Sequence, residues 1–503
     1  MSPQRPLFSL IIFLASLSLC FCYYMEEPLD QTNAERYPVH HNWRLIKPKH
    51  HQHFGFMPRT SRATWTSSRP HGTVVVSVDD YGAKADGRDD SEAFEKAWHD
   101  ACSRGAALVV PQNRIYLLKP ITFSGPCQPN TAFMVHGTIK AWPQISAYEQ
   151  DRLHWIVFDS VSNFRVDGGG TFNGNGKKWW QNSCKTNPNL VSHALLIKLP
   201  CKDGPTAVTF TGCNNLRVAN LRFIDAQQMH VTFQKCFNVI ASNLVVRAPE
   251  NSPNTDGIHV SETQNIQISN SDIGTGDDCV SIVSGSQNVR VTDITCGPGH
   301  GISIGSLGAD NSEAEVSNVV VNRATLTGTT NGVRIKTWQG GSGYARNIKF
   351  LNIAMQNVTN PIIIDQYYCD QQTPCREQKS GVQLSKVLYQ NIRGTSASEV
   401  AIKFDCSRTV PCREIYVQDV ILEPEGGSGG TIATCENVRY VNRGKFFPQC
   451  SPPPRISMWI ADFMSIDLRN DSWLQRMDVG GLMDVGEGFL SMDGCRRKKE
   501  LLE

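Results

Sequence analysis

The sequence has little charge and, after Tyr24, no long apolar run. Charged residues make up 19% of the 503 residues, and the formal net charge is only +2 at pH 7. No Lys/Arg run occupies the central region, so binding of nucleic acid by bulk electrostatics is excluded. No segment after Tyr24 could cross a bilayer. The 40% apolar content still fills a substantial core, so we expect a folded chain rather than a disordered one.

Paired CxxC units are also missing, which argues against a zinc site. The 17 cysteines instead fit an oxidising compartment, and because two of them lie in or beside the N-terminal apolar segment, at least one of the other fifteen is unpaired. Sequence does not fix their connectivity, but close neighbours suggest bridges as hypotheses. The proposed pairs are Cys369 with Cys375, Cys406 with Cys412, Cys435 with Cys450, and Cys279 with Cys296.

The first 72 residues and the last 53 differ from the rest. Residues 1–23 combine Arg5 with an apolar middle and are typical of a secretory signal peptide, with a membrane anchor of marginal length as the alternative. Residues 24–72 are rich in Pro, His and basic side chains, and we expect a flexible spacer there. Residues 451–503 contain five methionines and no strand repeat, and form an atypical C-terminal tail to which we assign no function.

Residues 73–450 carry a loose repeat in which a polar group ends in Asn and an alternating apolar segment follows. The repeated residues are Asn215, Asn238, Asn265, Asn288, Asn318 and Asn347. Their spacings of 23, 27, 23, 30 and 29 residues indicate a solenoid of short strands. Coils of this length, each with about three strands and corners, predict an all-β fold, the right-handed parallel β-helix. A propeller would need longer repeats and hairpin turns.

A short helix is expected before the solenoid. From Ser91 to Cys102, apolar side chains recur at helical spacing on one face, and Ser91 is a candidate N-cap. These apolar residues are Ala93, Phe94, Ala97, Trp98 and Ala101. The pattern predicts a short N-terminal helix that caps the end of a sheet.

Polar residues separated by about one coil form a second pattern, because such positions lie side by side about 4.8 Å apart. The series is Asp256, Asp277 with Asp278, His300, Arg334 with Lys336, and Tyr368, at intervals of 21, 23, 34 and 34 residues. Taken singly, each has an ordinary alternative: an Asp before Gly is usually a turn residue, and paired Asp residues can form a corner or bind calcium. A His between glycines can simply be packed. The shared register favours one site.

This combination suits hydrolysis of a glycosidic bond, which needs a protonated carboxyl on one side and ionised carboxylates that activate water on the other. Three clustered aspartates cannot all ionise, so one stays protonated. Arg334 and Lys336 would neutralise a carboxylate of the substrate. Tyr368 offers a ring and a hydroxyl to a sugar, and His300 a hydrogen bond that helps to set the charge of the aspartates.

The chain resembles the polygalacturonases of glycoside hydrolase family 28, and the plant members in particular. The motifs that carry the resemblance are Ser252-Pro253-Asn254-Thr255-Asp256-Gly257, Gly276-Asp277-Asp278-Cys279, Cys296-Gly297-Pro298-Gly299-His300-Gly301 and Arg334-Ile335-Lys336. The resemblance implies a right-handed parallel β-helix that hydrolyses α-1,4-linked galacturonan with inversion and without a metal or other cofactor. Inversion corresponds to a separation of roughly 6.5 to 9.5 Å between acid and base.

By matching positions, the resemblance also implies residue roles. Asp277 would be the general acid, and Asp256 and Asp278 would activate the water, with His300 among the catalytic residues. The substrate-binding residues would be Asn254, His300, Arg334, Lys336 and Tyr368. The expected partner is an acidic polysaccharide, pectin or homogalacturonan, met by a monomer in the extracellular space or cell wall. Once the signal is removed, neither nucleic acid nor a membrane is expected as a partner.

Three alternatives remain open on the sequence alone. A rhamnogalacturonan or xylogalacturonan hydrolase would share the fold and the three carboxylates, although Arg334 and Lys336 favour unbranched galacturonate. A pectate lyase would need calcium and an arginine base. A non-catalytic pectin-binding wall protein would use only the cationic stripe, and the intact set of three aspartates argues against it.

Overall fold

The chain divides into two units, Met1–Ser68 and Arg69–Glu503. The computed structural model describes residues 74–183, 185, 204–370 and 375–450, all within the second unit. The expected signal peptide (1–23), the spacer (24–72) and the tail (451–503) therefore lie outside the described residues. Among the described residues, no helix is long and apolar enough to span a membrane.

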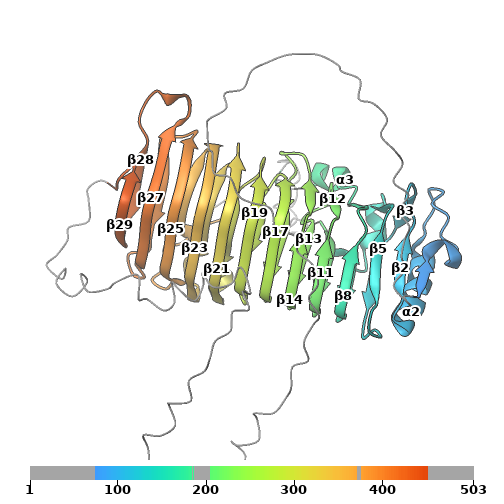
Figure 1. The fold of residues 1–503 in the computed structure, drawn as a ribbon. Helices are drawn as coiled ribbons and strands as arrows, with labels where there is room; N and C mark the ends of the chain where they lie inside the picture. Colours follow the sequence, from blue (N-terminus) through green and yellow to red (C-terminus); the bar gives the residue numbers. More distant parts are fainter. Residues whose placement is uncertain (1–73, 184, 186–203, 371–374, 451–503) are drawn as a thin grey trace, which may run out of the picture. The chain divides into compact units, whose positions relative to one another are not determined.

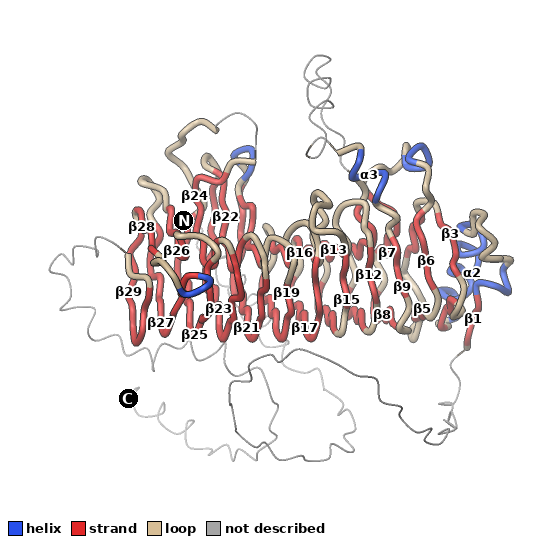
Figure 2. Tube along the Cα trace, turned by 90° about the horizontal axis from the view of Figure 1, so that it is seen from above, coloured by secondary structure: helices blue, strands red, loops and turns tan. Residues whose placement is uncertain are grey.

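Most of the described residues belong to short strands that stack coil upon coil in two parallel sheets (Figures 1 and 2). The larger sheet, called sheet A here, has 18 strands. They are β1 Val75–Ser77, β2 Ala107–Val110, β3 Ile115–Leu118, β5 Ala132–Val135, β6 Thr138–Ala141, β8 Ser162–Asp167, β9 Thr171–Asn173, β11 Asn214–Ala219, β12 Arg222–Ile224, β14 Phe237–Ser242, β15 Val245–Arg247, β17 Gln264–Gly274, β19 Gln287–Cys296, β21 Glu313–Thr327, β23 Ser342–Val358, β25 Gln383–Ser396, β27 Cys412–Pro424 and β29 Val438–Phe447.

The smaller sheet, sheet B, has 11 strands and carries the polar residues of interest. They are β4 Ile121–Ser124, β7 His154–Asp159, β10 Thr206–Thr211, β13 Val231–Gln234, β16 Ile258–Ser261, β18 Val280–Ile282, β20 Ile302–Leu307, β22 Asn331–Trp338, β24 Asn360–Tyr368, β26 Val400–Asp405 and β28 Ile432–Glu436. The helical elements are α2 Ser91–Arg104, α3 Lys177–Gln181, η1 Val78–Tyr81, η2 Ile145–Tyr148, η3 Ala309–Asn311 and η4 Glu425–Gly427. The predicted right-handed parallel β-helix is confirmed.

The interior of the coil is filled by in-register apolar side chains. Phe158, Phe210 and Phe233 come from consecutive strands of sheet B, and their rings stack with centroids 5.0 and 5.4 Å apart. Each of these side chains is fully buried. Burial of one such side chain stabilises the fold by about 1.5–3 kcal/mol. Because every coil repeats the pattern, the register of one coil fixes that of the next.

The repeated Asn residues form a ladder at one corner of the coil, as predicted. The side-chain amide of Asn238 donates to Asn215, that of Asn265 to Asn238 and that of Asn288 to Asn265, at 3.0, 3.2 and 2.9 Å. The ladder continues through Asn318 to Asn347. Each of the four residues from Asn215 to Asn288 has a positive φ of 53–58°, which Asn tolerates better than most residues. The ladder therefore satisfies both the corner conformation and its polar groups.

The predicted capping helix is confirmed as α2, which lies at one end of the strand stack (Figure 1). Its predicted apolar face is buried, and Trp98 packs against the rings of Phe123 and Phe164. The expectation that Ser91 caps the helix is wrong. Asp90 is the N-cap residue, and Ser91 is already helical, with its hydroxyl donating to Asp89. Asp90 makes no side-chain cap bond, and the backbone N–H of Ser91 donates instead to the side chain of Asp89.

All four proposed disulfides form: Cys279–Cys296, Cys369–Cys375, Cys406–Cys412 and Cys435–Cys450. A fifth, Cys102–Cys127, was not predicted and joins α2 to the loop before β5. Among the described residues, Cys213 and Cys236 are free and buried. The bridge between Cys279 and Cys296 matters most for the polar stripe, because it ties together two of the motifs that carry it.

Candidate active site

The aspartates and the histidine lie at the same corner of three consecutive coils. Asp256 comes just before β16, the pair Asp277 and Asp278 just before β18, and His300 just before β20. These three strands are neighbours in sheet B. The predicted alignment is therefore confirmed for the aspartates and His300, whereas Arg334 is the register partner of Ser303, and Tyr368 that of Trp338. Side chains far apart in sequence meet because each coil returns the chain to the same place.

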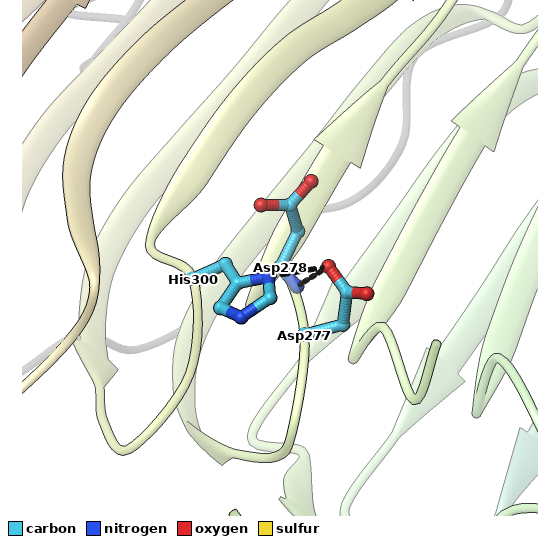
Figure 3. Close-up of side chains that lie close together, drawn as sticks. All are labelled: Asp277, Asp278 and His300. Atoms are coloured by element: carbon cyan, nitrogen blue, oxygen red, sulfur yellow. Dashed lines mark hydrogen bonds and ion pairs between the residues drawn. The ribbon is translucent and has the colours of Figure 1, made fainter. Parts of the chain in front are cut away.

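Asp277 is paired with His300. The two side chains come from adjacent loops (Figure 3), and His300 Nδ1 lies 2.9 Å from Asp277 Oδ1. The same oxygen accepts a hydrogen bond of 2.8 Å from the backbone N–H of Asp278. Burial raises the pKa of Asp277, but the hydrogen bond and charge of His300 outweigh it, and the pKa lies below its usual range. The contact with His300 thus favours the carboxylate form of Asp277.

Asp278 is buried, with its side chain 2% exposed, and is bound by two cations. Arg334 Nη2 donates to Oδ1 at 2.8 Å, and Lys336 Nζ donates to Oδ2 at 3.0 Å. The hydroxyl of Ser303 donates to Oδ1 at 2.7 Å. Both carboxylate oxygens therefore have charge-assisted partners, as a buried charge requires.

Asp256 is buried without a directly bound cation. The hydroxyl of Ser281 donates to its Oδ2 at 2.7 Å. Burial raises the pKa of Asp256 well above its usual range, and the neighbouring charges of Asp277 and Asp278 raise it further. Among the three clustered carboxyl groups, the raised pKa thus falls on Asp256 and not on Asp277, the expected general acid.

The predicted substrate-binding cations lie close to the aspartates. Arg334 and Lys336 are on β22, with side chains 14% and 10% exposed, and here both engage Asp278. Lys336 Nζ also lies 5.3 Å from the ring centroid of Tyr368, at the end of β24. Burial raises the pKa of Tyr368 to about 12, so its hydroxyl stays neutral. Trp338 packs edge-on against the same ring.

Asn254 lies in the loop that carries Asp256 and has a positive φ of 54°. Its side chain is partly exposed. It is therefore on the loop where a substrate-binding role was expected, two residues before the carboxyl group.

Sequence reasoning missed three residues that contact the aspartates or their partners: Ser281, Ser303 and His259. His259 and Ser281 are 22 residues apart, as are Ser281 and Ser303, so the coil interval that revealed the aspartates would also have found them. His259 Nδ1 lies 2.7 Å from the Ser281 hydroxyl. Burial lowers the pKa of His259 to about 4, so the ring is neutral.

Asp277, Asp278 and His300 each offer one possible metal-ligand atom, and these atoms lie within 4.8 Å of one another. A divalent cation there would face Arg334 and Lys336 and would have to compete with the bond between His300 and Asp277. This donor set fits proton transfer better than metal binding. The approach of the Asp277 and Asp278 oxygens is shorter than the roughly 6.5 to 9.5 Å expected between acid and base in inverting glycosidases. This short separation counts against Asp277 and Asp278 as an inverting acid–base pair, and inversion stays an untested prediction.

Comparison with known proteins gives consistent matches. Residues 102–445 match the family model described as glycosyl hydrolases family 28. The chain is 57% identical to polygalacturonase QRT2 of Arabidopsis thaliana over 400 residues, covering 79% of this chain and 86% of that protein. It is 56% identical to polygalacturonase-2 of Solanum lycopersicum over 384 residues, covering 76% of this chain and 82% of that protein.

Solved structures agree on the fold. The polygalacturonase from Erwinia carotovora ssp. carotovora superposes with a TM-score of 0.60 at 22% identity, covering 75% of this chain and 99% of that one. The exopolygalacturonase from Thermotoga maritima gives the same TM-score and identity, covering 73% of this chain and 90% of that one.

Proposed function

The chain belongs to family 28 of the glycosyl hydrolases, and on that premise we propose that it is a polygalacturonase that hydrolyses the α-1,4-galacturonosyl bonds of pectin. The observation that supports the proposal is that three clustered carboxyl groups each have different hydrogen-bond partners. Asp277 is paired with a histidine, Asp278 with two cations, and Asp256 with a serine. Such a set can give a proton on one side of a bond and accept one on the other.

On the acid side, Asp277 donates the proton to the leaving glycosidic oxygen. When substrate covers the site, Asp277 loses its remaining contact with water, and burial already acts to raise its pKa. His300 Nδ1, at 2.9 Å, holds the carboxyl group of Asp277 in place for this transfer.

On the other side of the bond, Asp278 and Asp256 activate the attacking water. Asp278 is the first acceptor of the water proton, because its two cations hold it as a carboxylate. Asp256 lies beside it and contributes once it has given up its own proton. We expect inversion at the anomeric carbon, because water and acid act from opposite sides of the sugar.

Arg334, Lys336 and Tyr368 form the substrate-binding side of the site, together with Asn254. The partly exposed guanidinium of Arg334 has a donor fork that suits the carboxylate of a galacturonate unit. The Tyr368 ring, already in contact with Lys336 and Trp338, offers a face to the sugar. Unbranched galacturonan is the substrate that these groups favour.

The relatives are plant polygalacturonases, and we infer that this chain acts outside the cell, on pectin of the wall. We further infer that residues 1–23 direct export, that residues 73–450 form the catalytic domain, and that the enzyme works as a monomer. Size-exclusion chromatography of the secreted protein, with N-terminal sequencing, tests the last inference and the site of signal cleavage.

Substitution Asp277→Asn tests the function. We expect release of reducing ends from polygalacturonate to fall by a factor of about 10²–10⁴, the usual contribution of a general acid. Because Asn nearly matches Asp in shape, the melting temperature should change little. Asp293→Asn, which removes an exposed carboxylate on β19 paired with Arg323, is the matched control and should keep full activity.

Undiminished hydrolysis by Asp277→Asn would contradict the assignment. The same assay, run with rhamnogalacturonan and xylogalacturonan beside polygalacturonate, separates the three substrate classes. NMR of the first anomer released decides the stereochemistry: an initial β-anomer from the α-linked chain means inversion.

A further inference from the structure

A row of side chains runs across the outer face of sheet B beneath the catalytic groups. Its members are Thr232, His259, Ser281, Ser303 and Arg334, one from each of the consecutive strands β13, β16, β18, β20 and β22. Register partners on neighbouring strands lie about 4.8 Å apart. Each serine of the row can therefore reach a side chain on either side of its own strand.

The two serines build two hydrogen-bond chains of the same design. Ser281 donates to Asp256 at 2.7 Å and contacts His259 Nδ1 at 2.7 Å. Ser303 donates to Asp278 at 2.7 Å and accepts a bond of 3.0 Å from Arg334 Nε. Each of these aspartates is thus held by a serine, and each serine is held by a second side chain behind it.

The residue behind the serine differs between the two chains. Arginine only donates hydrogen bonds, so Ser303 must turn its proton toward Asp278, and the chain is complete only while that oxygen accepts. A neutral histidine carries one donor nitrogen and one acceptor nitrogen. His259 can therefore donate to Ser281 when Asp256 is ionised, or accept from Ser281 when Asp256 is protonated.

We propose that His259 and Ser281 are positioning residues that keep Asp256 oriented in both of its protonation states during turnover, whereas Ser303 and Arg334 hold Asp278 as a carboxylate. The inference rests on the proposed function. In the ionised state, His259 Nδ1–H donates to Ser281, and Ser281 donates to Asp256. In the protonated state both bonds reverse, so Asp256 donates to Ser281 and Ser281 donates to Nδ1.

The proton balance is simple. Asp256 gains one proton, which comes from water, and His259 exchanges its Nδ1 proton for one on Nε2. The site as a whole gains a single proton. Neither state leaves Asp256 Oδ2, the Ser281 hydroxyl or His259 Nδ1 without a partner, which would otherwise cost stability.

Other charged groups face this chain and act on it as well. Asp277, Asp278 and Lys336 face Asp256, while Asp278 and Lys336 face His259. The backbone carbonyl of Asp256 accepts from buried His230, whose own pKa is lowered by burial to about 4. Among these contacts, the bond from Ser281 lowers the pKa of Asp256, so loss of the hydroxyl leaves that pKa higher still.

The test is the pH dependence of kcat on polygalacturonate for Ser281→Ala. We expect kcat at its optimum to fall about tenfold, KM to change less than about twofold, and the acidic limb to move up by about one pH unit. His259→Ala should likewise lower kcat and move the acidic limb to higher pH. His259→Asn should restore most of the activity, because an amide both donates and accepts. Thr232→Ala, one strand away in the same row, is the control and should match the parent enzyme.

Two results would overturn the inference: an acidic limb that stays in place while kcat falls at every pH, or an unchanged kcat. If His259→Asn does not recover the kcat that His259→Ala loses, His259 has no part in the hydrogen-bond chain to Asp256. If Ser281→Ala does not fold, the two His259 variants decide, because His259 is less buried than Ser281. A parent enzyme that leaves polygalacturonate intact would instead refute the proposed function.

Discussion

Arg334 Nη2 donates to Asp278 Oδ1 at 2.8 Å, across 56 residues of sequence. The guanidinium that was expected to bind the carboxylate of the substrate thus also binds a carboxylate of the enzyme. Substitution of Arg334 therefore removes a contact with Asp278 as well as the proposed contact with substrate.

For Arg334→Ala we expect a loss in both binding and turnover. Removal of one preorganised donor from an active site typically lowers the rate by a factor of about 10²–10³, so kcat/KM should fall by a factor of about a hundred or more. KM should rise because the substrate loses a cation, and kcat should fall because Asp278 loses a hydrogen bond. Steady-state kinetics on polygalacturonate separate the two.

Arg323→Ala is the matched control, since Arg323 pairs with Asp293 at an exposed position on β21. It should leave both constants within error of the parent enzyme. A rise in KM without any fall in kcat for Arg334→Ala would mean that its bond to Asp278 has no part in turnover.

Asp256→Asn should raise thermal stability at neutral pH. The native state raises the pKa of Asp256, so the native state binds more protons than the unfolded state at pH values above the ordinary aspartate pKa of about 3.9. Below a pH of about 3.9, Asp256 is protonated in both states and costs the native state nothing. As the pH rises toward the native pKa, the native state loses stability because the unfolded state ionises more readily. The gain in melting temperature from Asn should therefore be largest near pH 7 and vanish below about pH 4.

The control variant for this experiment should change stability in the opposite direction. Arg323 lowers the pKa of Asp293, so Asp293→Asn should cost a little stability above the ordinary aspartate pKa and nothing at lower pH. Melting curves of the three proteins from pH 3 to pH 8 provide the measurement. A gain for Asp256→Asn that is the same at every pH would show that charge is not its cause.

Asn265→Ala should destabilise the coil more than Asn265→Gly. Both variants lose the amide bonds to Asn238 and Asn288, but Ala at a positive φ adds a penalty of about 1–2 kcal/mol that Gly avoids. Melting temperatures of the two variants isolate the backbone contribution. Equal melting temperatures would assign the whole effect to the amide ladder.

The coil interval made the fold and the aspartate stripe predictable. Corner asparagines repeat because each coil needs a residue that tolerates positive φ, so their spacing reports the length of the coil. Once that length is known, Asp256, Asp277 and His300 must lie in neighbouring coils. The same reasoning extends to all positions one coil apart, whatever their chemistry.

Which side chains contact one another was harder to predict from the sequence than the fold. Ser303 and Arg334 are register partners, but the pairing of β20 with β22 then shifts between Ile304 and Leu307, next to Lys336, and no spacing rule predicts this irregularity. Ser281 and His259 were overlooked because serine and histidine in an alternating strand are usually ordinary surface residues. Their role becomes visible only when the hydrogen-bond partners are known.

The bridge between Cys279 and Cys296 joins the loop of the aspartate pair to the strand that leads to His300. Cys279 follows Asp278 directly, and Cys296 lies four residues before His300. A chain made under reducing conditions would still wind its apolar coils, because their packing needs no sulfur chemistry. It would lack the covalent bond that fixes the loop of Asp277 relative to His300. Folded protein from such a host should therefore turn over less substrate per molecule than protein matured under oxidising conditions.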